Sequence, residues 1–420
     1  MASPILNAMI PPMPVRAGQA DVPAPPSLRP GRRAYFIGIG GCGMSGLARM
    51  LRGRGIAVSG SDMAPSSATD ALVAEGIAVT FDQQAGTVPE GVDLVVASAA
   101  IKPDHPELVT ATHRGIEILT YAEALGAAMA GRTGVAVAGT HGKSTTVGML
   151  GHALICAGLD PTVIVGAVSS HLSAPGMPPS GFRLGSDRVP IGPRAGEPGV
   201  VVAEACEFNR SFHALYPRVA AITSVEADHL DIYGSLDAVV QSFAEFAARV
   251  PSAAEGGRLL IAHEGAHRRE VASATTAEVQ TIGFNPSADW HVTYDASTHR
   301  VGLNHRGRHL GNWTLQLPGE HMAFDSAVAA TLAIWLGADL ARVSEALAGF
   351  RGIDRRMQLV ERVRIGNVEP AVPVYDDYGH HPTEIDVTLR ALREHEKPEK
   401  RGGRLICVFQ PHQHSRTRFL

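Results

Sequence analysis

The sequence predicts an α/β protein built from three domains in tandem. Two observations carry this prediction. Short apolar segments alternate with stretches of helical spacing, and two glycine-rich turns each separate an apolar segment from a helix. The length of 420 residues fits two or three domains of about 150 residues each. We expect a Rossmann-like first domain (33–132), a central phosphate-loop domain (133–350) and a Rossmann-like third domain (351–420).

Composition excludes several classes of function. The net charge of -4 argues against a general nucleic-acid-binding protein, which is normally basic. No apolar run approaches the ~18 residues of a membrane-spanning helix. Residues 1–32 are rich in Pro and Ala and lack the pattern of a secretion signal, so we expect a disordered tail. The four scattered cysteines form no C-x-x-C pair, which favours a reducing, cytoplasmic compartment.

The first domain alternates strands and helices. Apolar strands are predicted near 34–40, 56–62 and 92–100, and the segment 115–125 reads as a strand that enters a helix. A helix is predicted over 44–55, where the spacing of apolar residues is helical and the segment ends at a glycine. This alternation predicts a parallel, doubly wound sheet.

The first glycine turn has the spacing of a dinucleotide-binding site. Gly38, Gly40 and Gly43 form G-x-G-x-x-G, and Asp62 lies nineteen residues beyond the last glycine. A nicotinamide-dependent dehydrogenase is therefore one hypothesis. The glycines, however, specify only that a pyrophosphate is bound at a helix N-terminus.

The central domain begins with a second strand, glycine loop and helix. The strand is predicted over 134–139 and the helix over 144–158. Residues 173–199 are crowded with Pro and Gly and predict a long surface loop. Further elements are expected as two buried strands, an amphipathic helix, β-like pieces and a late helix, at 199–207, 218–231, 236–250, 281–317 and 321–337.

The composition changes again after the segment 350–357, which lies at the predicted start of the third domain. The run 372–395 reads as strand, turn and helix, and a further strand is predicted shortly after Gly403. One or two such units are too few to enclose a core. We therefore expect this domain to be incomplete at Leu420, and weak or absent catalysis if the 420 residues are the whole product.

The second glycine loop, GTHGKST (139–145), predicts a phosphate site. Backbone N–H groups between strand and helix face an anion, Lys143 adds charge for the β- and γ-phosphates, and Ser144 is placed to bind Mg²⁺. Val137 stands where the usual pattern has its first glycine. The alternative is a glycine turn with a surface lysine.

Two further residues are candidates for the metal. Glu204 and His229 each follow an apolar strand, which would bring both to the ligand-binding edge of the sheet. A carboxylate and an imidazole beside the phosphates could hold Mg²⁺, although this ion prefers oxygen ligands. Glu204 as an ion-paired or capping acid and His229 as a turn histidine stay open as alternatives.

Seven motifs in order resemble the Mur ligase family, the amide-forming ATPases of peptidoglycan precursor synthesis. The resemblance extends from about Ala34 to Leu420. The motifs are GIGGCGMSGLA, GTHGKSTT, EACEFNRSF, EADHLDIYGSLDAVVQSFAEFA, FRGIDRRM, DDYGHHPTEI and FQPHQHSRTR. GTHGKST is the family's own phosphate loop, which accounts for Val137. In this family the first glycine turn holds the diphosphate of a UDP-sugar.

The resemblance implies an ATP-dependent ligase. The reaction joins L-alanine to the carboxylate of UDP-N-acetylmuramate through an acyl phosphate, with ATP and Mg²⁺ required. The implied partners are these two substrates, with no nucleic acid or membrane, in a monomer or homodimer. Whether alanine is preferred over glycine or serine stays open.

The resemblance also implies a set of site residues. Those for the UDP-sugar are Gly38, Gly40, Gly41, Gly43, Asp62 and Ser98. Those for ATP are Gly139, Thr140, His141, Gly142, Lys143, Ser144 and Thr145. The catalytic set is Lys143, Glu204, His229, Arg355 and Arg356, and the metal set is Ser144, Glu204 and His229. Those for ribose and alanine are Asp376, Tyr378, His380, His412 and Arg416, the last as partner of the alanine carboxylate.

The segment 379–384 has a second interpretation as a helix start. His381 would cap the helix, with Pro382 first and Glu384 third. A zinc site from His380, His381 and Glu384 is disfavoured because the spacing matches no zinc motif.

Four positions depart from the family pattern. Ser224 stands where Asn is frequent, and Met322 and Asp325 replace two asparagines near the adenine. Gln413 replaces an arginine near the amino acid.

Three other functions remain as alternatives. A peptide-recycling ligase usually reads D-D-F-A-H-H-P, so Tyr378 and Gly379 favour the alanine enzyme. The substitutions also allow a non-catalytic nucleotide-binding remnant. A dehydrogenase would leave the second loop, Glu204 and His229 unexplained.

Overall fold

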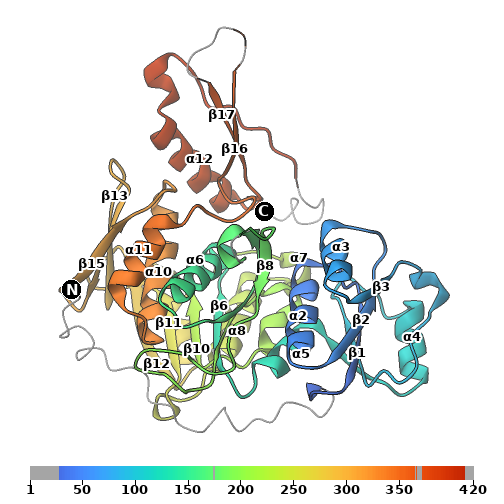
Figure 1. Cartoon of the computed structure of the whole chain (residues 1–420). Helices are drawn as coiled ribbons and strands as arrows, with labels where there is room; N and C mark the ends of the chain where they lie inside the picture. Colours follow the sequence, from blue (N-terminus) through green and yellow to red (C-terminus); the bar gives the residue numbers. More distant parts are fainter. Residues whose placement is uncertain (1–27, 174–175, 365, 367–370, 412–420) are drawn as a thin grey trace.

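The computed structural model describes residues 28–173, 176–364, 366 and 371–411 (Figure 1). The N-terminal domain contains a five-stranded parallel sheet in the order β3-β2-β1-β4-β5, which confirms the predicted doubly wound arrangement. Its strands are β1 (Arg33–Ile37), β2 (Ala57–Ser61), β3 (Ala78–Thr80), β4 (Leu94–Ala97) and β5 (Glu117–Thr120). Its helices are α2 (Cys42–Gly53), α3 (Ser67–Ala74), η2 (Gln83–Ala85), α4 (Pro106–His113) and α5 (Tyr121–Met129).

The middle domain contains a ten-stranded mixed sheet in the order β15-β14-β13-β12-β11-β10-β6-β9-β7-β8. Its strands are β6 (Thr133–Ala138), β7 (Thr162–Ser169), β8 (Ser180–Arg183), β9 (Val200–Glu204), β10 (Val219–Ile222), β11 (Arg258–Ala262), β12 (Glu278–Gly283), β13 (Trp290–Asp295), β14 (Arg300–His305) and β15 (Arg308–Thr314). Its helices are α6 (Lys143–Cys156), η3 (Ser170–Leu172), η4 (Phe208–Ala214), α7 (Leu230–Tyr233), α8 (Leu236–Ala247), η5 (Ala253–Glu255), α9 (Arg268–Ser273), α10 (Glu320–Trp335) and α11 (Leu340–Gly349).

The surface loop predicted over 173–199 is wrong in part. Ser180–Arg183 forms β8, which pairs antiparallel with β7 at the edge of the sheet. Arg194 is fully buried, where it donates hydrogen bonds to Glu197 and Thr133. The Pro and Gly content of this segment predicted its turns correctly. The strand forms because Ser180–Arg183 pairs with the edge of β7, and the local sequence does not reveal that edge.

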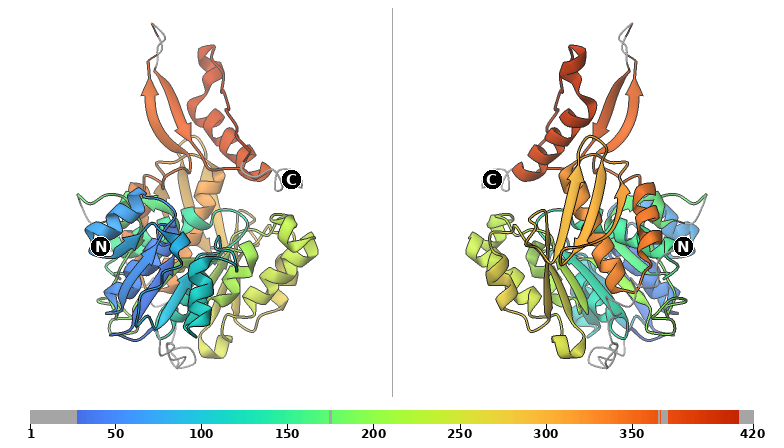
Figure 2. Two further views of the ribbon diagram at one scale, coloured as in Figure 1. Left: turned by 90° about the vertical axis from the view of Figure 1, so that its right-hand side faces the viewer. Right: turned by 90° about the vertical axis from the view of Figure 1, so that its left-hand side faces the viewer.

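The C-terminal domain is formed by β16 (Gln358–Val363), β17 (Val372–Asp376), α12 (Pro382–Glu396) and η6 (Pro398–Arg401). The two strands are antiparallel, and Figure 2 shows this domain projecting from the rest of the molecule. The strand predicted after Gly403 is not formed over 403–411, where Val408 is 94% exposed. An apolar run becomes a strand only where a neighbour pairs with its backbone. Most of the predicted tail lies outside the described residues. So do three residues predicted for the third domain, namely His412, Gln413 and Arg416.

The side chains of β6 alternate between two hydrophobic cores, one of which is shared with the N-terminal domain. Val135 and Val137 face a core shared with α6, α10 and α11, whereas Ala136 and Ala138 face a second core that contains residues of α2, α5 and α8. Helices of the N-terminal domain therefore pack directly against the middle sheet. Among the described residues no helix has the length and apolar character needed to cross a membrane.

Candidate functional site

The phosphate loop joins β6 to α6 in a conformation that requires glycine. Gly139 and Gly142 have φ of 140° and 80°, and a Cβ on Gly139 would lie 2.0 Å from Thr223 Oγ1. Ser224, one of the departures from the family pattern, accepts a hydrogen bond from the His141 N–H at 2.9 Å. Its hydroxyl thus holds the loop in place.

Lys143 lies over its own loop. Its Nζ donates to Gly139 O at 2.6 Å and to Thr140 O at 3.1 Å, and it forms an ion pair with Glu207 at 2.9 Å. Burial opposes the charge on Lys143, but the Glu207 carboxylate raises the pKa of this lysine above its usual value. Lys143 is therefore protonated, and Glu207 balances its charge.

Two of the three predicted metal ligands lie together. The Ser144 hydroxyl is 2.9 Å from Glu204 Oε1, and Glu204 also accepts from the Gly166 N–H at 2.9 Å. His229 groups instead with Glu207 and Asp228, whose ligand atoms lie within 4.8 Å of one another. His229 has φ of 51° and is the N-cap residue just before α7, so its position at a turn is also confirmed.

The first glycine turn is closed by Asp62. The Gly40 N–H donates to Asp62 Oδ2 at 2.7 Å, and the N–H groups of Gly38 and Ile39 donate to Ser61 O at 2.9 Å. A Cβ on Gly38 would lie 3.1 Å from that of Ser98. The structure therefore gathers the predicted UDP-sugar residues around one turn, with Asp62 bonded to its backbone.

The two glycine turns approach each other. The Cys42 thiol, at the start of α2, is 3.5 Å from Val165 O in β7 of the middle domain. The partly buried Tyr121 lies beside Gly43, and the Glu204 carboxylate contributes, after burial, to raising the pKa of both Cys42 and Tyr121. An anion on the first turn would thus lie near the Ser144–Glu204 pair.

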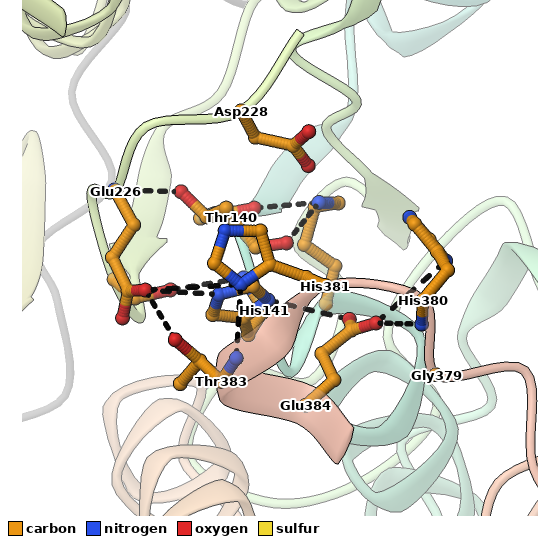
Figure 3. Close-up of polar contacts among 12 residues, drawn as sticks. Thr140, His141, Glu226, Asp228, Gly379, His380, His381, Thr383 and Glu384 are labelled. Atoms are coloured by element: carbon orange, nitrogen blue, oxygen red, sulfur yellow. Dashed lines mark hydrogen bonds and ion pairs between the residues drawn. The ribbon is translucent and has the colours of Figure 1, made fainter. Parts of the chain in front are cut away.

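A cluster of polar residues connects the phosphate loop to the C-terminal domain (Figure 3). His141 Nδ1 is 3.3 Å from Glu384 Oε1, and His141 Nε2 is 3.4 Å from Glu226 Oε2. The Thr383 hydroxyl donates to Glu226 at 2.7 Å, and His381 Nε2 lies 3.2 Å from Ala227 O. Against the effect of burial, the two carboxylates raise the pKa of His141 to about 9.

The predicted helix start at 379–384 is confirmed. His381 is the N-cap of α12, its Nδ1 accepts from the Thr383 N–H at 3.2 Å, and Pro382 is the first helical residue. Glu384 accepts from the His380 N–H at 3.2 Å rather than from the cap residue. One turn therefore both caps a helix and delivers side chains to the phosphate loop.

The predicted arginines take different positions. Arg356 lies 3.4 Å from Glu384 Oε1 and is a quarter exposed, whereas Arg355 is 58% exposed and pairs with Asp376 at 3.5 Å. Both guanidinium groups lie over the Tyr378 ring. His380 Nδ1 is 3.0 Å from Tyr378 O. Arg356 therefore lies within the cluster, and Arg355 at its rim.

A cavity of about 210 Å³ opens beside the loop. Its lining includes His141, Arg356, Phe324 and the two departures Met322 and Asp325. Asp325 is buried, and a Cβ on Gly142 would lie 2.4 Å from its Oδ1. Burial raises the pKa of Asp325 to about 8, which makes the carboxyl largely neutral at pH 7.

Sequence reasoning missed three acidic residues of this site. Glu207 and Glu226 stand three and two positions beyond Glu204 and Ser224, inside quoted motifs, and Glu384 was assigned only to a cap. Their role depends on partners from other segments, namely Lys143 for Glu207 and His141 for the other two. The one feature of the sequence that could have indicated them is the number of acidic residues that follow the predicted buried strands.

Family models match most of the chain. The Mur ligase family catalytic-domain model matches residues 33–133, the Mur ligase middle-domain model matches 137–333, and the Mur ligase glutamate ligase domain model matches 355–419.

Two curated relatives are similar along almost the whole length. The chain is 40% identical over 401 residues to a UDP-N-acetylmuramate–L-alanine ligase of Kineococcus radiotolerans, covering 92% of this chain and 77% of that protein. It is 39% identical over 391 residues to the protein of that name in Acidothermus cellulolyticus, covering 92% of this chain and 76% of that protein.

Solved structures share the fold. A UDP-N-acetylmuramate–alanine ligase from Thermotoga maritima superposes with a TM-score of 0.68 at 27% identity, covering 86% of this chain and 77% of that one. A UDP-N-acetylmuramate:L-alanyl-γ-D-glutamyl-meso-diaminopimelate ligase from Neisseria meningitides gives 0.69 at 24% identity, covering 77% of this chain and 99% of that one.

Proposed function

This chain belongs to the Mur ligase family, and we propose that it is an ATP-dependent ligase that joins L-alanine to the carboxylate of UDP-N-acetylmuramate in peptidoglycan precursor synthesis. The observation that carries the proposal is the chain of contacts between the two glycine turns. Cys42 of the first turn lies 3.5 Å from Val165 O, and the next residue, Gly166, donates to Glu204, which accepts from Ser144 of the second. The relatives named above supply the identity of the substrates. ATP and nucleotide sugars are cytoplasmic compounds, so we propose a cytoplasmic location.

The residues of the second loop fit ATP and Mg²⁺. The Ser144 hydroxyl and the Glu204 carboxylate form a pair of hard oxygen ligands at 2.9 Å, the type that Mg²⁺ prefers. Any side chain at Gly139 would collide with Thr223, so only glycine allows this loop conformation. In this conformation the backbone N–H groups can face an anion. We propose that Ser144 and Glu204 hold the ion, which shields phosphate charge when bound, and that His229 contributes from its group with Glu207 and Asp228.

Positive charge is what the first chemical step requires. A carboxylate is a poor electrophile, so it must first take the γ-phosphoryl group of ATP, which releases ADP. In this step two anions, the carboxylate and the γ-phosphate, must approach each other. We propose that Lys143 moves from Glu207 to the phosphates and that Arg356, beside the loop, stabilises the charge that develops. Attack by the alanine amine on the resulting acyl phosphate forms the amide and releases phosphate.

Phosphate release tests the proposal. The purified chain is supplied with ATP, Mg²⁺ and UDP-N-acetylmuramate, and L-alanine, glycine, L-serine or the tripeptide L-alanyl-γ-D-glutamyl-meso-diaminopimelate is added in turn. We expect release with L-alanine to exceed that with the tripeptide. Lys143→Ala should abolish release and leave UDP-N-acetylmuramate binding unchanged, because the lysine belongs to the second loop only.

Lys400→Ala is the matched control, since this lysine is exposed on η6 far along the chain. Release with the tripeptide alone would assign the recycling reaction instead. Loss of UDP-sugar binding in folded Lys143→Ala would contradict the division of roles between the two turns.

A further inference from the structure

Three side chains to which the proposed reaction assigns no chemical step meet between the middle and C-terminal domains. They are His141 of the phosphate loop, Glu226 after β10 and His381 at the start of α12. One ligand atom from each lies within 4.8 Å of the others. The phosphate chemistry proposed above uses the backbone of the loop and leaves the His141 imidazole unassigned.

Each imidazole donates one ring N–H to an oxygen acceptor and has its other nitrogen within 4.0 Å of Glu226. His141 Nδ1 is 3.3 Å from the Glu384 carboxylate, which only accepts, so Nδ1 carries the proton. His381 Nε2 is 3.2 Å from the carbonyl of Ala227, so Nε2 carries the proton there. His141 Nε2 and His381 Nδ1 face Glu226, at 3.4 and 4.0 Å from its Oε2, and His381 Nδ1 also accepts from the Thr383 N–H at 3.2 Å.

The arrangement has the pattern of a metal site. Metal-bound histidines usually donate their second ring N–H to a carboxylate or a backbone carbonyl, as both do here. His141 Nε2 is buried and makes no hydrogen bond, although Glu226 lies near. Ligand atoms around a tetrahedral Zn²⁺ are about 3.3 Å apart, so only His381 needs to move closer.

We propose that His141, Glu226 and His381 bind a borderline divalent transition-metal ion such as Zn²⁺. Two imidazole nitrogens and one carboxylate oxygen suit this class of ion, whereas Mg²⁺ prefers oxygen only. His141 and Glu226 line the cavity of about 210 Å³, which leaves space for a water as fourth ligand. The ion replaces the bond between the Thr383 N–H and His381 Nδ1, and it ties the phosphate loop to α12.

A bound proton is the competing occupant. With a proton on Nε2, His141 pairs with both Glu226 and Glu384, and no metal is needed to hold the group together. The experiment must therefore detect the ion itself rather than the contact between the domains.

The test is calorimetric titration of the metal-free full-length chain with Zn²⁺, in excess Mg²⁺ so that oxygen sites are occupied. Co²⁺ titration then reports coordination through the strong visible absorption of a four- or five-coordinate ion. His381→Asn removes the imidazole yet keeps a good N-cap, so α12 is retained. Glu226→Gln tests the second segment, and Glu384→Gln removes the partner of His141 Nδ1.

We expect His381→Asn and Glu226→Gln to lower Zn²⁺ affinity at least 100-fold and Glu384→Gln to lower it about 10- to 100-fold. His395→Gln, elsewhere on α12, is the control and should bind as the parent does. Equal affinity in the parent, His381→Asn and Glu226→Gln, each folded by circular dichroism, would overturn the proposal. So would a Co²⁺ spectrum typical of six water or oxygen ligands.

Discussion

At the scale of single residues, this site is organised by buried acids that face cations. Glu207 neutralises Lys143 while the phosphate position is empty, and Glu384 contacts His141 and Arg356 together. Asp325 binds a proton instead, because its burial outweighs the attraction of Arg356 and His141. Carboxyl groups beside the same cavity are therefore ionised where a cation contacts them, as at Glu384, and neutral where burial dominates, as at Asp325.

Asp325→Asn should stabilise the protein more at pH 8 than at pH 5. The pKa of Asp325 rises from 3.8 to about 8 on folding, so the folded state binds the proton more tightly than the unfolded state. Stability therefore falls as pH rises through this range, and Asn removes the effect. At about 1.36 kcal/mol per pKa unit, we expect a gain in the free energy of unfolding of roughly 5 kcal/mol at pH 8 and roughly 2 kcal/mol at pH 5, measured by urea denaturation.

The exposed Asp104→Asn is the control and should show no such trend. A gain for Asp325→Asn that is equal at the two pH values would contradict the assignment of a neutral carboxyl.

Glu384→Gln should lower kcat and leave UDP-N-acetylmuramate binding unchanged. The amide cannot form an ion pair with Arg356 or accept from the His380 N–H as strongly as a carboxylate does. Losing a buried charged hydrogen bond costs about 1.5–3 kcal/mol, which corresponds to a loss of roughly 10- to 100-fold. Steady-state kinetics with ATP varied gives the measurement. Glu394→Gln on the same helix serves as control, and equal kcat in the two variants would refute the role of Glu384.

At the scale of elements, strand–turn–helix units position the chemistry. β1 and β6 each end in a glycine turn, and α2 and α6 begin immediately after these turns. The N-terminus of a helix and its free N–H groups attract anions, which is why we propose a pyrophosphate site at each unit. β9 and β10 add Glu204 and the segment 223–229 at the same edge of the sheet.

Gly139→Ala should remove ATP binding and retain UDP-N-acetylmuramate binding. The new Cβ would lie 2.0 Å from Thr223 Oγ1 at a φ of 140°, so the loop must open. We expect ATP affinity, measured by calorimetry, to fall at least about tenfold, because the N–H groups no longer converge on one anion.

Gly131→Ala is the matched control. This glycine has φ of 72° and nothing within 4 Å of its added Cβ, so the substitution costs about 1 kcal/mol of backbone strain and leaves ATP binding intact. Normal ATP affinity in Gly139→Ala would show that the loop tolerates a side chain and that its geometry is not required.

At the scale of the whole molecule, one core holds the N-terminal and middle domains together. α2 and α5 contribute Leu47, Met50 and Leu125 to the same core as Ala136 and Phe243 of the middle domain. The C-terminal domain makes a smaller contribution, with Ala391 and Leu392 of α12 packed against the other core. The two glycine turns are therefore fixed relative to each other by apolar packing.

Gly126→Ala should separate this shared core and lower the melting temperature. Alanine is the better helix former by about 1 kcal/mol, but its Cβ in α5 would lie 1.9 Å from Ala214 O in η4. Overpacking of this kind costs about 1–3 kcal/mol, so we expect a net fall of several degrees by calorimetry. Gly349→Ala in α11 meets nothing within 4 Å and should be neutral or stabilising. A Gly126→Ala protein as stable as Gly349→Ala would mean that the domains do not pack as described.

The amount predictable from sequence differed between segments for physical reasons. The strands and helices beside both glycine turns were predicted correctly because local spacing specifies them. β8 and the missing strand after Gly403 were predicted wrongly because pairing with a neighbour decides whether such a segment is a strand. The roles of the departures Ser224 and Asp325 also needed the structure, which places the first under the phosphate loop and the second beside Gly142.

The sequence by itself determined the two glycine turns, the order of the domains and the family, since glycine spacing and contiguous motifs are local properties of the chain. Only the tertiary structure decided which charges meet. Lys143 and Glu207 are 64 residues apart, and His141 and Glu384 are 243 apart, so no local pattern pairs them. Their energies depend on burial and on distances of a few ångströms, which exist only once the sheets and helices have packed.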